Sequence, residues 1–368
     1  MSKGVSSDRS SRTMLVNKTA SAKASKGTAE AKEARKGEGN GAGGGAGGAG
    51  GAGELGAVID IGSNSVRLAV GARTRTGDVR LVAESRDSTR LAQGLDVSGR
   101  LDPHAMEASV DAVVRMVAQA RAHGAERVEI VATCAVREAE NGQRFVAMIN
   151  AETDLEVRVI SGEEEGRLAF LGAAKQFDLR KGWSAVLDIG GGSTELAIAR
   201  KGDVQAVVSM PVGAVRLTER FGGPERAPHE HYQDMRRFMD GLLTRHLKHV
   251  HGEAETLVAT GGTATALGLM DLLSRHPGKT DPEDKVAVSR AVRGYKLERT
   301  AVKEWTKRLR EMSMKERFGV PGLSRDRASV IVAGLVILHR TMKRLKCQTV
   351  VVSAGSIRDG VLHEMLGR

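Results

Sequence analysis

The chain has 368 residues and a formal net charge of +11, with 40% hydrophobic residues, 27% charged residues and two cysteines. No run approaches the roughly 18 apolar residues of a membrane span, and two cysteines cannot form a disulfide framework. The composition therefore excludes a membrane-spanning protein and a disulfide-stapled scaffold. It predicts a globular protein of the reducing cytoplasm that is long enough to form two lobes.

The positive charge is concentrated near the N-terminus. Residues 1–53 hold nine Lys or Arg and four acidic residues, so the rest of the chain carries a net charge of +6. Aromatic residues make up 3% of the chain, too few to predict a base-stacking surface. We therefore expect no specific nucleic acid and no membrane as partner, and favour a polyanionic ligand such as a chain of phosphates.

Residues 1–53 are rich in Ser, Lys, Ala and Gly and end in a Gly/Ala tract over 41–53. Such a composition cannot bury enough apolar surface to offset the entropy of ordering, so we expect a disordered tail. A Ser/Lys/Arg-rich start is also typical of transit peptides, which is the less favoured alternative.

The first element after the tail is a predicted β-hairpin over 58–70. Two aliphatic runs flank a turn of small residues, Ser63, Asn64 and Ser65, and Asp60 closes the first run. The open backbone N–H groups of such a turn can hold an anion.

A strand is expected over 79–85. The loop that follows it contains one basic residue, Arg90. Two interpretations are equally good: Arg90 contacts phosphate, or it is a solvated loop residue.

A helix is predicted over 104–123 from the period of its apolar residues, and a buried strand over 128–133. Arg137 and Glu138 follow that strand, where open α/β sheets bind their ligands. Glu138 is thus a candidate base that orients a water and Arg137 a candidate phosphate ligand, although a surface glutamate opening a helix is the commoner local interpretation. Cys134 is excluded as a phosphatase nucleophile, because Arg137 follows too closely for a phosphate-wrapping cysteine loop.

After a predicted strand over 156–160, a helix begins with Glu163, Glu164 and Glu165 in its first turn. Acidic residues in that position are usually partners of the helix dipole. Three of them near a phosphate site can equally hold Mg²⁺ through water. The residues alone leave both interpretations open.

A second copy of the hairpin covers residues 185–199, with the turn Gly190-Gly191-Gly192-Ser193. It aligns with the first copy without a gap, at an offset of 128 residues that places Asp188 on Asp60. Such a repeat predicts two similar lobes that face one phosphate-bearing ligand from opposite sides of a cleft.

The next segments are predicted as a strand over 203–208, two helices, and a strand–glycine–helix unit over 256–267. In that unit Gly261 and Gly262 leave a helix N-terminus open to phosphate or to the edge of a nucleotide. Five histidines between residues 229 and 251 are expected to be solvated, because their spacing is irregular and no carboxylate pair lies nearby.

The remaining segments are predicted as helices over 299–316 and 328–339, a strand over 349–353 and a closing helix over 357–366 that packs back on the first lobe. The expected division of the chain is a tail (1–53), lobe I (54–178), lobe II (179–353) and a C-terminal helix (354–368).

Six motifs together resemble the exopolyphosphatase and guanosine pentaphosphate phosphohydrolase family, within the actin, hexokinase and heat-shock chaperone ATPase superfamily. The resemblance runs from about residue 57 to residue 366 and implies an α/β fold of two actin-like, ribonuclease H-like lobes with a cleft between them, each a mixed sheet flanked by helices. The motifs, in family order, are DIGSNSVR (60–67), TCAVREA (133–139), ISGEEE (160–165), DIGGGSTE (188–195), ATGGT (259–263) and SAGS (353–356).

The resemblance also implies roles for single residues. Glu138 matches the catalytic base, and Glu164 or Glu165 matches a second essential carboxylate near the metal, with Glu164 taken as catalytic and Glu165 as a metal ligand. Asp60 and Asp188 match positions for Mg²⁺ or Mn²⁺. The residues expected to bind phosphate or the rest of the substrate are Ser63, Asn64, Ser65, Arg90, Arg137, Gly190, Gly191, Gly192, Ser193, Gly261 and Gly262.

The implied activity is hydrolysis of phosphoanhydride bonds: release of terminal orthophosphate from polyphosphate, conversion of guanosine pentaphosphate to tetraphosphate, or both. Longer family members carry an additional helical domain, so this chain is expected to be a short form. Short polyphosphates, guanosine pentaphosphate and nucleotides stay open as substrates. The oligomeric state is open as well, with a homodimer as the candidate assembly.

Three alternatives share this fold. The main one is a non-catalytic sensor that binds polyphosphate or guanosine tetra- or pentaphosphate and signals by closing its lobes. An ATP-dependent sugar or acetate kinase is disfavoured by the sequence around Glu138. A chaperone ATPase is disfavoured because no peptide-binding domain follows.

Overall fold

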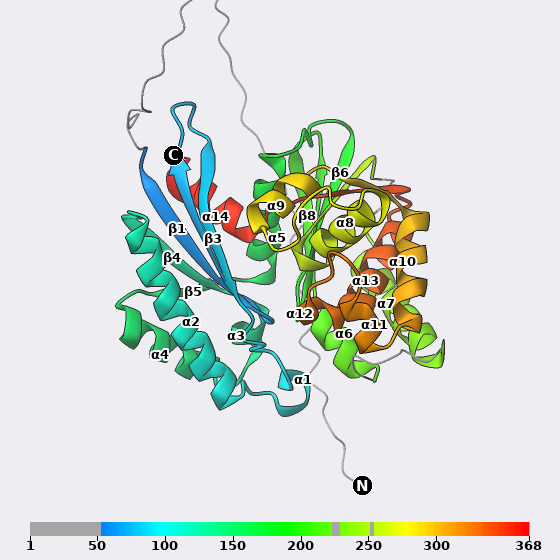
Figure 1. Cartoon of the computed structure of the whole chain (residues 1–368), viewed down its shortest axis with the longest axis horizontal. Helices are drawn as coiled ribbons and strands as arrows, with labels where there is room; N and C mark the ends of the chain where they lie inside the picture. The colour runs from blue at the N-terminus through cyan, green and yellow to red at the C-terminus, as the bar shows by residue number, and fades with distance from the viewer. Residues whose placement is uncertain (1–52, 223–228, 251–253, 368) are drawn as a thin grey trace, which may run out of the picture.

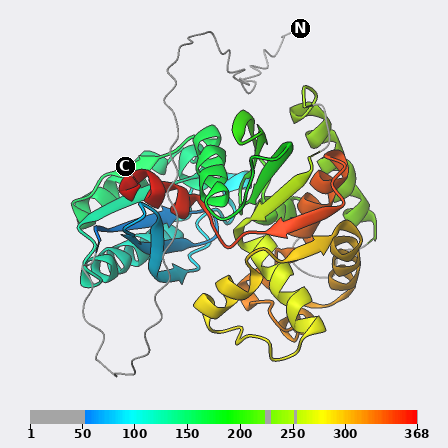
Figure 2. The ribbon, with the colours of Figure 1, turned by 90° about the horizontal axis from the view of Figure 1, so that it is seen from above.

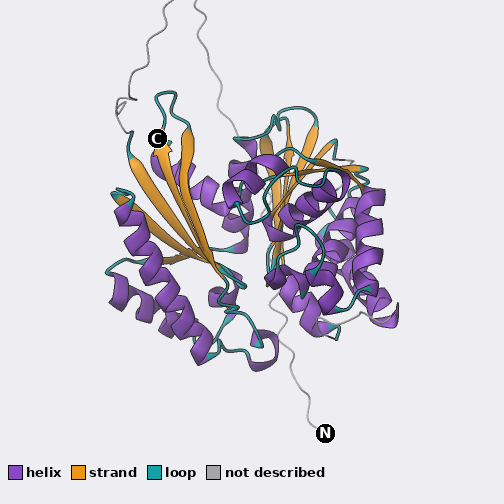
Figure 3. Ribbon diagram, viewed as in Figure 1, coloured by secondary structure: helices purple, strands orange, loops and turns teal. Residues whose placement is uncertain are grey.

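The structure, a computed structural model, describes residues 53–222, 229–250 and 254–367. The predicted tail over 1–53 lies outside these residues apart from Gly53, and so does His251. Two mixed β-sheets stand side by side with helices on their faces (Figure 1, Figure 3). The predicted α/β class with two lobes of sheet and helix is confirmed.

The first sheet has five strands in the order β3-β2-β1-β4-β5. β1 and β2 pair antiparallel as the predicted hairpin, whereas β4 and β5 extend the sheet in parallel. The strands are β1 (Leu55–Ile61), β2 (Val66–Arg73), β3 (Val79–Asp87), β4 (Arg127–Ala132) and β5 (Val157–Val159). β1 is buried from Gly56 to Ile61, as expected for a central strand whose apolar run is broken only by Asp60.

The second sheet has six strands in the order β10-β11-β9-β6-β7-β8. The strands are β6 (Trp183–Ile189), β7 (Thr194–Arg200), β8 (Asp203–Met210), β9 (Thr256–Thr260), β10 (Lys296–Glu298) and β11 (Thr349–Val352). Its central hairpin repeats the register of the first, because Asp60 lies opposite Arg67 and Asp188 lies opposite Glu195. The repeat seen in the sequence is therefore a structural repeat.

The helices connect and cover these strands. They are α1 (Leu95–Ser98), α2 (Pro103–Ala122), α3 (Cys134–Glu138), α4 (Gly142–Thr153), α5 (Gly162–Ala174), α6 (Ala214–Arg220), α7 (His229–His246), α8 (Gly261–Arg275), α9 (Lys285–Val292), α10 (Arg299–Glu311), α11 (Met314–Phe318), α12 (Arg325–Ala328), α13 (Ile331–Arg344) and α14 (Ile357–Leu366). Within the described part of the chain, none of them combines the length and apolar character needed to cross a bilayer.

Two helix predictions are wrong in their boundaries. The expected helix over 299–316 is two helices, because Ser313 forms a capping box with Glu316 and starts α11 afresh. The expected helix over 328–339 begins later, at Ile331, and runs on to Arg344 as α13.

Helix α5 follows the strands of the first sheet in the chain but packs on the second sheet, and α14 follows the strands of the second sheet but packs on the first. α5 packs on β6, β7 and β8, α14 packs on β1 and β2, and the two helices contact each other (Figure 2). The apolar cluster between the sheets accordingly contains Val58 of β1 and Val258 of β9. Gly360 permits the close crossing, because a Cβ there would overlap the carbonyl oxygen of Leu168.

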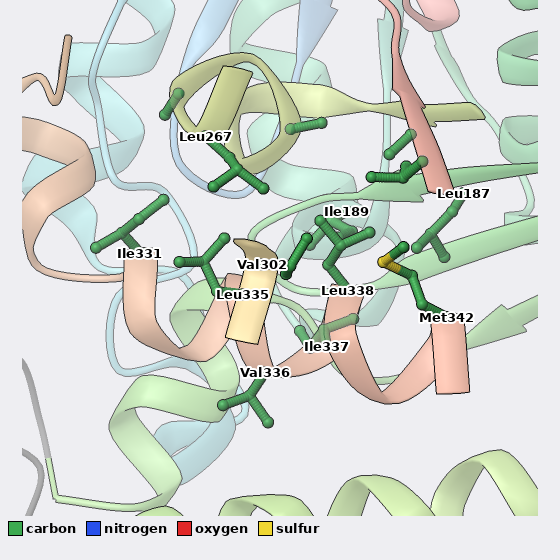
Figure 4. Close-up of a cluster of buried hydrophobic side chains, with 14 of the residues drawn as sticks. Leu187, Ile189, Leu267, Val302, Ile331, Leu335, Val336, Ile337, Leu338 and Met342 are labelled. Atoms are coloured by element: carbon green, nitrogen blue, oxygen red, sulfur yellow. The ribbon is translucent and has the colours of Figure 1, made fainter. Parts of the chain in front are cut away.

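The core of the second lobe is built around α13. Its apolar residues pack against β6 and α8, where Ile331, Leu335, Leu187, Ile189 and Leu267 belong to one buried cluster (Figure 4). A helix that is apolar over most of its surface is stable only when other elements enclose it. This packing fixes β6, and with it the second glycine turn.

We expect the buried side chain of Arg317 to stabilise the protein. Its side chain is 1% exposed and donates hydrogen bonds to the carbonyl oxygens of Leu309 (Nε, 2.9 Å) and Ala328 (Nη1, 3.1 Å), at the ends of α10 and α12. Helix-terminal carbonyls lack partners within their own helix. Arg317→Met should therefore lower the free energy of unfolding in urea by about 3 kcal/mol. The exposed Lys315→Met on the same helix should change it by less than about 0.5 kcal/mol, and equal effects of the two variants would contradict the prediction.

Candidate active site

The two small-residue turns of the repeated hairpins meet face to face. A Cβ added to Gly191 would lie 3.0 Å from the Cβ of Ser63 and 3.5 Å from the Cβ of Asn64. A Cβ on Gly192 would lie 2.7 Å from the Ser63 hydroxyl. Side chains larger than hydrogen at these two positions would therefore separate the turns.

Both turns are closed in the same way. The N–H of Gly62 donates to the carbonyl of Ser65 at 3.1 Å, and the N–H of Gly190 donates to the carbonyl of Ser193 at 3.0 Å. The side-chain amide nitrogen of Asn64, Nδ2, is buried and has no hydrogen-bond partner among the described residues. A buried donor without a partner is costly unless a ligand satisfies it, which makes Asn64 a good candidate for an anion contact.

Arg90 lies beside the first turn. Its backbone N–H donates to the carbonyl of Asn64 at 3.2 Å, and Ala92 donates to the carbonyl of Ser63 at 2.8 Å. The Arg90 side chain is exposed, and its backbone has a φ of 52°, in the left-handed region. The loop thus holds the guanidinium at the rim of the site.

Four acidic side chains gather beneath the turns. Asp60 and Asp188 end the central strands of the two sheets and are 9% and 7% exposed. Burial raises the pKa of Asp60, which the charges of Arg67 and Arg358 partly oppose. The pKa of Asp188 is raised to about 6, mainly by burial; the charge of Arg67 opposes the shift and that of Asp60 adds to it.

The other two are Glu165 on α5 and Glu195 on β7. Burial raises the pKa of both, to about 8 for Glu195 and well above the usual range for Glu165, where the charge of Glu195 adds to the effect. One oxygen of Glu195 accepts a hydrogen bond from the Ser209 hydroxyl at 2.8 Å. The other is buried without a hydrogen-bond partner among the described residues. Glu195 was not predicted as a site residue, although it stands opposite Asp188 in the hairpin.

Glu164 does not join this cluster. Its carboxylate pairs with Arg158 of β5 and its side chain is 31% exposed, whereas that of Glu165 is 6% exposed. Successive residues of a helix point about 100° apart. Because α5 packs on β6, β7 and β8, the helix turns Glu165 toward the site and Glu164 away from it.

The Arg137 side chain contacts the acidic cluster through Glu165. Its Nη1 donates to the carbonyl of Ile160 at 2.7 Å and lies 3.4 Å from a carboxylate oxygen of Glu165. The guanidinium is therefore engaged by these two acceptors, and its charge opposes the raised pKa of Glu165.

Glu138 lies at the end of α3, directly after the buried strand β4. One of its oxygens accepts a hydrogen bond from Arg216 of α6, and the other from the Cys134 thiol at 3.4 Å. Its side chain is 37% exposed, so water can reach it. Arg216 also lies 3.0 Å from Asp96; sequence reasoning placed it only at the start of a helix.

The Cys134 thiol remains excluded as a nucleophile on the geometry. It is buried beneath Gly192, and burial together with the charge of Glu138 raises its pKa to about 12. A thiol that stays protonated does not attack phosphorus.

A cavity of about 460 Å³ opens between the two sheets next to the acidic cluster. Four arginines line it: Arg67, Arg86, Arg327 and Arg358. The pKa of Arg67 is lowered to about 10, mainly by burial and also by the charges of Arg358 and Arg86. Two nitrogens of Arg86 are buried without a hydrogen-bond partner in the described part of the chain. Like charges held together in this way favour an anionic ligand.

Gly261 and Gly262 form the wall between this cavity and the carboxylates. A Cβ on Gly261 would lie 2.7 Å from the Asp188 carboxylate, and one on Gly262 would overlap the Arg327 guanidinium. Gly261 also has a φ of 85°, which favours glycine. Sequence reasoning found the glycines but not the four arginines, which come from four separate segments.

The donor set fits a hard divalent cation. Buried carboxylates that raise one another's pKa bind Mg²⁺ or Mn²⁺ favourably, because the cation removes their repulsion. Among the residues described, no group of three or more His, Cys, Asp or Glu side chains is placed so that it could hold a metal ion by itself. Mg²⁺ commonly binds through one or two carboxylates and keeps water and substrate as its other ligands.

Comparison with known proteins agrees with this geometry. Residues 70–368 match the model of the Ppx/GppA phosphatase family. The chain is 27% identical to exopolyphosphatase 1 of Mycobacterium tuberculosis over 84% of this chain and 87% of that protein. It is 28% identical to guanosine-5'-triphosphate,3'-diphosphate pyrophosphatase of Vibrio cholerae over 85% of this chain and 59% of that protein.

A solved structure is similar throughout. The crystal structure of the Ppx/GppA family member of Aquifex aeolicus is 31% identical, with a TM-score of 0.70, over 85% of this chain and 97% of that chain. The expected resemblance is confirmed by both the family match and the fold. This chain, with its paired glycine turns over buried carboxylates, belongs to the Ppx/GppA phosphatase family.

Proposed function

We propose that the protein hydrolyses terminal phosphoanhydride bonds and releases orthophosphate from inorganic polyphosphate, guanosine pentaphosphate or both. The observation that carries the proposal is the meeting of two glycine turns above buried carboxylates, with Glu138 beside them. The relatives named exopolyphosphatase and guanosine-5'-triphosphate,3'-diphosphate pyrophosphatase support the same chemistry.

In this proposal the backbone N–H groups of 63–65 and 191–193 hold the terminal phosphate, while the N–H of Gly190 closes its own turn. Glu138 orients a water in line with the bridging oxygen and takes its proton. The water oxygen bonds to phosphorus, the bridging P–O bond breaks, and its electron pair leaves with the shortened phosphate chain. Positioning and charge neutralisation supply most of the rate, because phosphoryl transfer needs little covalent help from the protein.

Mg²⁺ or Mn²⁺ is the proposed cofactor. Asp60, Asp188 and Glu165 are the ligands expected from the sequence, and we add Glu195 as a neighbour that would face the ion directly or through water. When bound, the cation neutralises charge on the reacting phosphate. Glu164, expected from the sequence as a catalytic residue, is left out of the proposed site, because it pairs with Arg158.

The cavity of about 460 Å³ is the proposed place for the rest of the substrate. Arg67, Arg86, Arg327 and Arg358 suit phosphates, and the volume is within the range of sites for small molecules. A guanosine moiety could lie there while its terminal phosphate reaches the turns. A short polyphosphate needs the turns alone.

One assay decides between substrates: orthophosphate release from polyphosphates of graded length, guanosine pentaphosphate and ATP, each with Mg²⁺ and Mn²⁺. Release from none of them, together with tight binding by calorimetry, would favour a non-catalytic sensor. We also propose a cytoplasmic location, because the two cysteines of the chain, Cys134 and Cys347, are both buried as thiols.

Arg327 should distinguish the two substrate classes. Arg327→Met removes a cation of the cavity, so kcat/KM for guanosine pentaphosphate should fall about tenfold or more, whereas kcat/KM for tripolyphosphate should fall less than about threefold. Arg325→Met is the matched control, since Arg325 stacks on the ring of Phe318 and does not line the cavity. An equal loss for both substrates would contradict the assignment of this cavity to the nucleoside end.

The acidic cluster predicts an unusual dependence of stability on pH. The ordinary values for Asp188 and Glu195 are 3.8 and 4.5, and burial raises them to about 6 and about 8. Between these limits the unfolded chain releases protons that the folded protein retains, so stability falls as pH rises from about 4 to 8, by about 1.4 kcal/mol per pH unit for each retained proton. Thermal unfolding in EDTA should show this slope.

Two further measurements test whether the buried carboxylates cause this dependence of stability on pH. Glu195→Gln should flatten the part of the slope that lies between about pH 4.5 and 8, and Mg²⁺ should stabilise the protein more at pH 8 than at pH 5, because the cation binds the ionised carboxylates. A stabilisation by Mg²⁺ that does not depend on pH would contradict the assignment.

A further inference from the structure

A second, very small cavity lies directly between the two glycine turns. It measures about 10 Å³ and is lined by residues of both lobes, among them Ser63, Gly191, Gly192 and Arg216. A space of this size holds about one water, and a phosphate group is several times larger. The turns must therefore move apart before a terminal phosphate can lie between them.

Residues of α6 hold the turns in this closed arrangement. Arg216 bonds to Glu138 of α3 and lies 3.0 Å from Asp96 of α1, while Glu219 lies 3.4 Å from the backbone N–H of Gly94. All of these contacts join α6, which follows the second glycine turn, to segments of the first lobe. Separating the turns would strain or break them.

Arg216 is well placed to meet what enters. Its side chain is 12% exposed and lines the small cavity itself. Burial opposes the charge of this guanidinium, but the hydrogen bond and charge of Glu138 raise its pKa overall. A planar guanidinium binds phosphate oxygens as well as it binds a carboxylate, often with two parallel hydrogen bonds.

We propose that Arg216 exchanges partners during the reaction: it pairs with Glu138 in the free protein and with the terminal phosphate in the complex. This proposal rests on the proposed function. Arrival of the phosphate draws the guanidinium away, and a carboxylate oxygen of Glu138 becomes free to accept a proton from water. The base is thereby held by Arg216 until substrate is present.

The exchange is tested by a double-mutant cycle on binding. Calorimetry in Mg²⁺ buffer measures the Kd of tripolyphosphate with imido bridges, which is not hydrolysed, for wild type, Glu138→Gln, Arg216→Ala and the double variant. Glu138→Gln releases Arg216 to the phosphate, so it should tighten Kd about five- to tenfold. With Arg216→Ala present, Glu138→Gln should change Kd less than twofold.

The cycle separates the exchange from simpler explanations. If Glu138 merely repelled the anion, Glu138→Gln would tighten Kd equally in both backgrounds, and this result would overturn the proposal. If Arg216 only held the lobes together, Arg216→Ala would tighten Kd as much as Glu138→Gln does, whereas the exchange predicts that Arg216→Ala weakens Kd. A tightened Kd in Arg216→Ala would therefore overturn the proposal as well.

Turnover supplies a second readout. Arg216→Ala should lower kcat on the best substrate of the panel about 100-fold, and Arg216→Lys should recover part of it. Arg220→Ala is the control. Arg220 lies one helical turn further along α6, is exposed and stacks on Phe238, so this variant should keep kcat within twofold of wild type. An unchanged kcat in Arg216→Ala would overturn the exchange and leave the proposed function standing. Absence of turnover in wild type would overturn the proposed function, while the binding cycle would still decide the exchange.

Discussion

Glu138→Gln should lower kcat for orthophosphate release by about 10²- to 10⁴-fold, the usual contribution of a general base. Glutamine has the same shape, but its amide cannot take a proton from the attacking water. Among the predicted carboxylates that the structure describes, Glu138 combines solvent access with a place beside the turns. The measurement is kcat at saturating polyphosphate or guanosine pentaphosphate, with Mg²⁺ present.

Glu140→Gln is the matched control. Glu140 lies two residues further on, is exposed, and pairs with Arg100 at 3.0 Å on the surface. Its loss should change kcat less than twofold, since exposed ion pairs contribute little. Equal kcat for Glu138→Gln and wild type would remove Glu138 from the proposed role.

Of the glycine-to-alanine substitutions in the second lobe, we expect Gly213→Ala to lower stability and activity the most. A Cβ at Gly213 would overlap the carbonyl group of Gly191 and lie 2.6 Å from the backbone nitrogen of Gly192. These are backbone atoms of the phosphate turn, so no side-chain rotation can relieve the clash. We expect a loss of about 3 kcal/mol in the free energy of unfolding and at least a tenfold loss in kcat/KM, because the backbone of the phosphate turn must leave its present position.

Gly241→Ala controls for the chemical change itself. Gly241 lies within α7, is exposed, and has no atom within 4 Å of an added Cβ. Alanine is the better helix former by about 0.8–1 kcal/mol, so this variant should gain stability and keep full activity. Stability of Gly213→Ala equal to wild type by urea unfolding would show that α6 is not held against the turn.

Local sequence was enough to predict the hairpins and their turns. Each strand is a short aliphatic run, and the small residues around Gly62 and Gly190 admit a tight turn, so the pattern is complete within about 13 residues. The repeat at a constant offset then predicted that both turns serve one ligand. Their meeting in the structure follows from that repeat.

Tertiary packing decided what local sequence could not. Arg67, Arg86, Arg327 and Arg358 converge on one cavity from distant segments, and each alone looks like an ordinary solvated arginine. The choice between Glu164 and Glu165 depends on the rotation of α5, which is set by its contacts with the second sheet. That rotation has no signature in the three consecutive glutamates.

The exchange of α5 and α14 has a consequence for any attempt to divide the protein. A gene cut between α5 and β6 would encode two products, and each would carry the helix that the other one needs. The first product would leave Val58 and Ala69 bare, and the second would leave Val186 and Val258 bare. The two products would have to be made together and find each other, so the duplicated halves behave as a single cooperative unit.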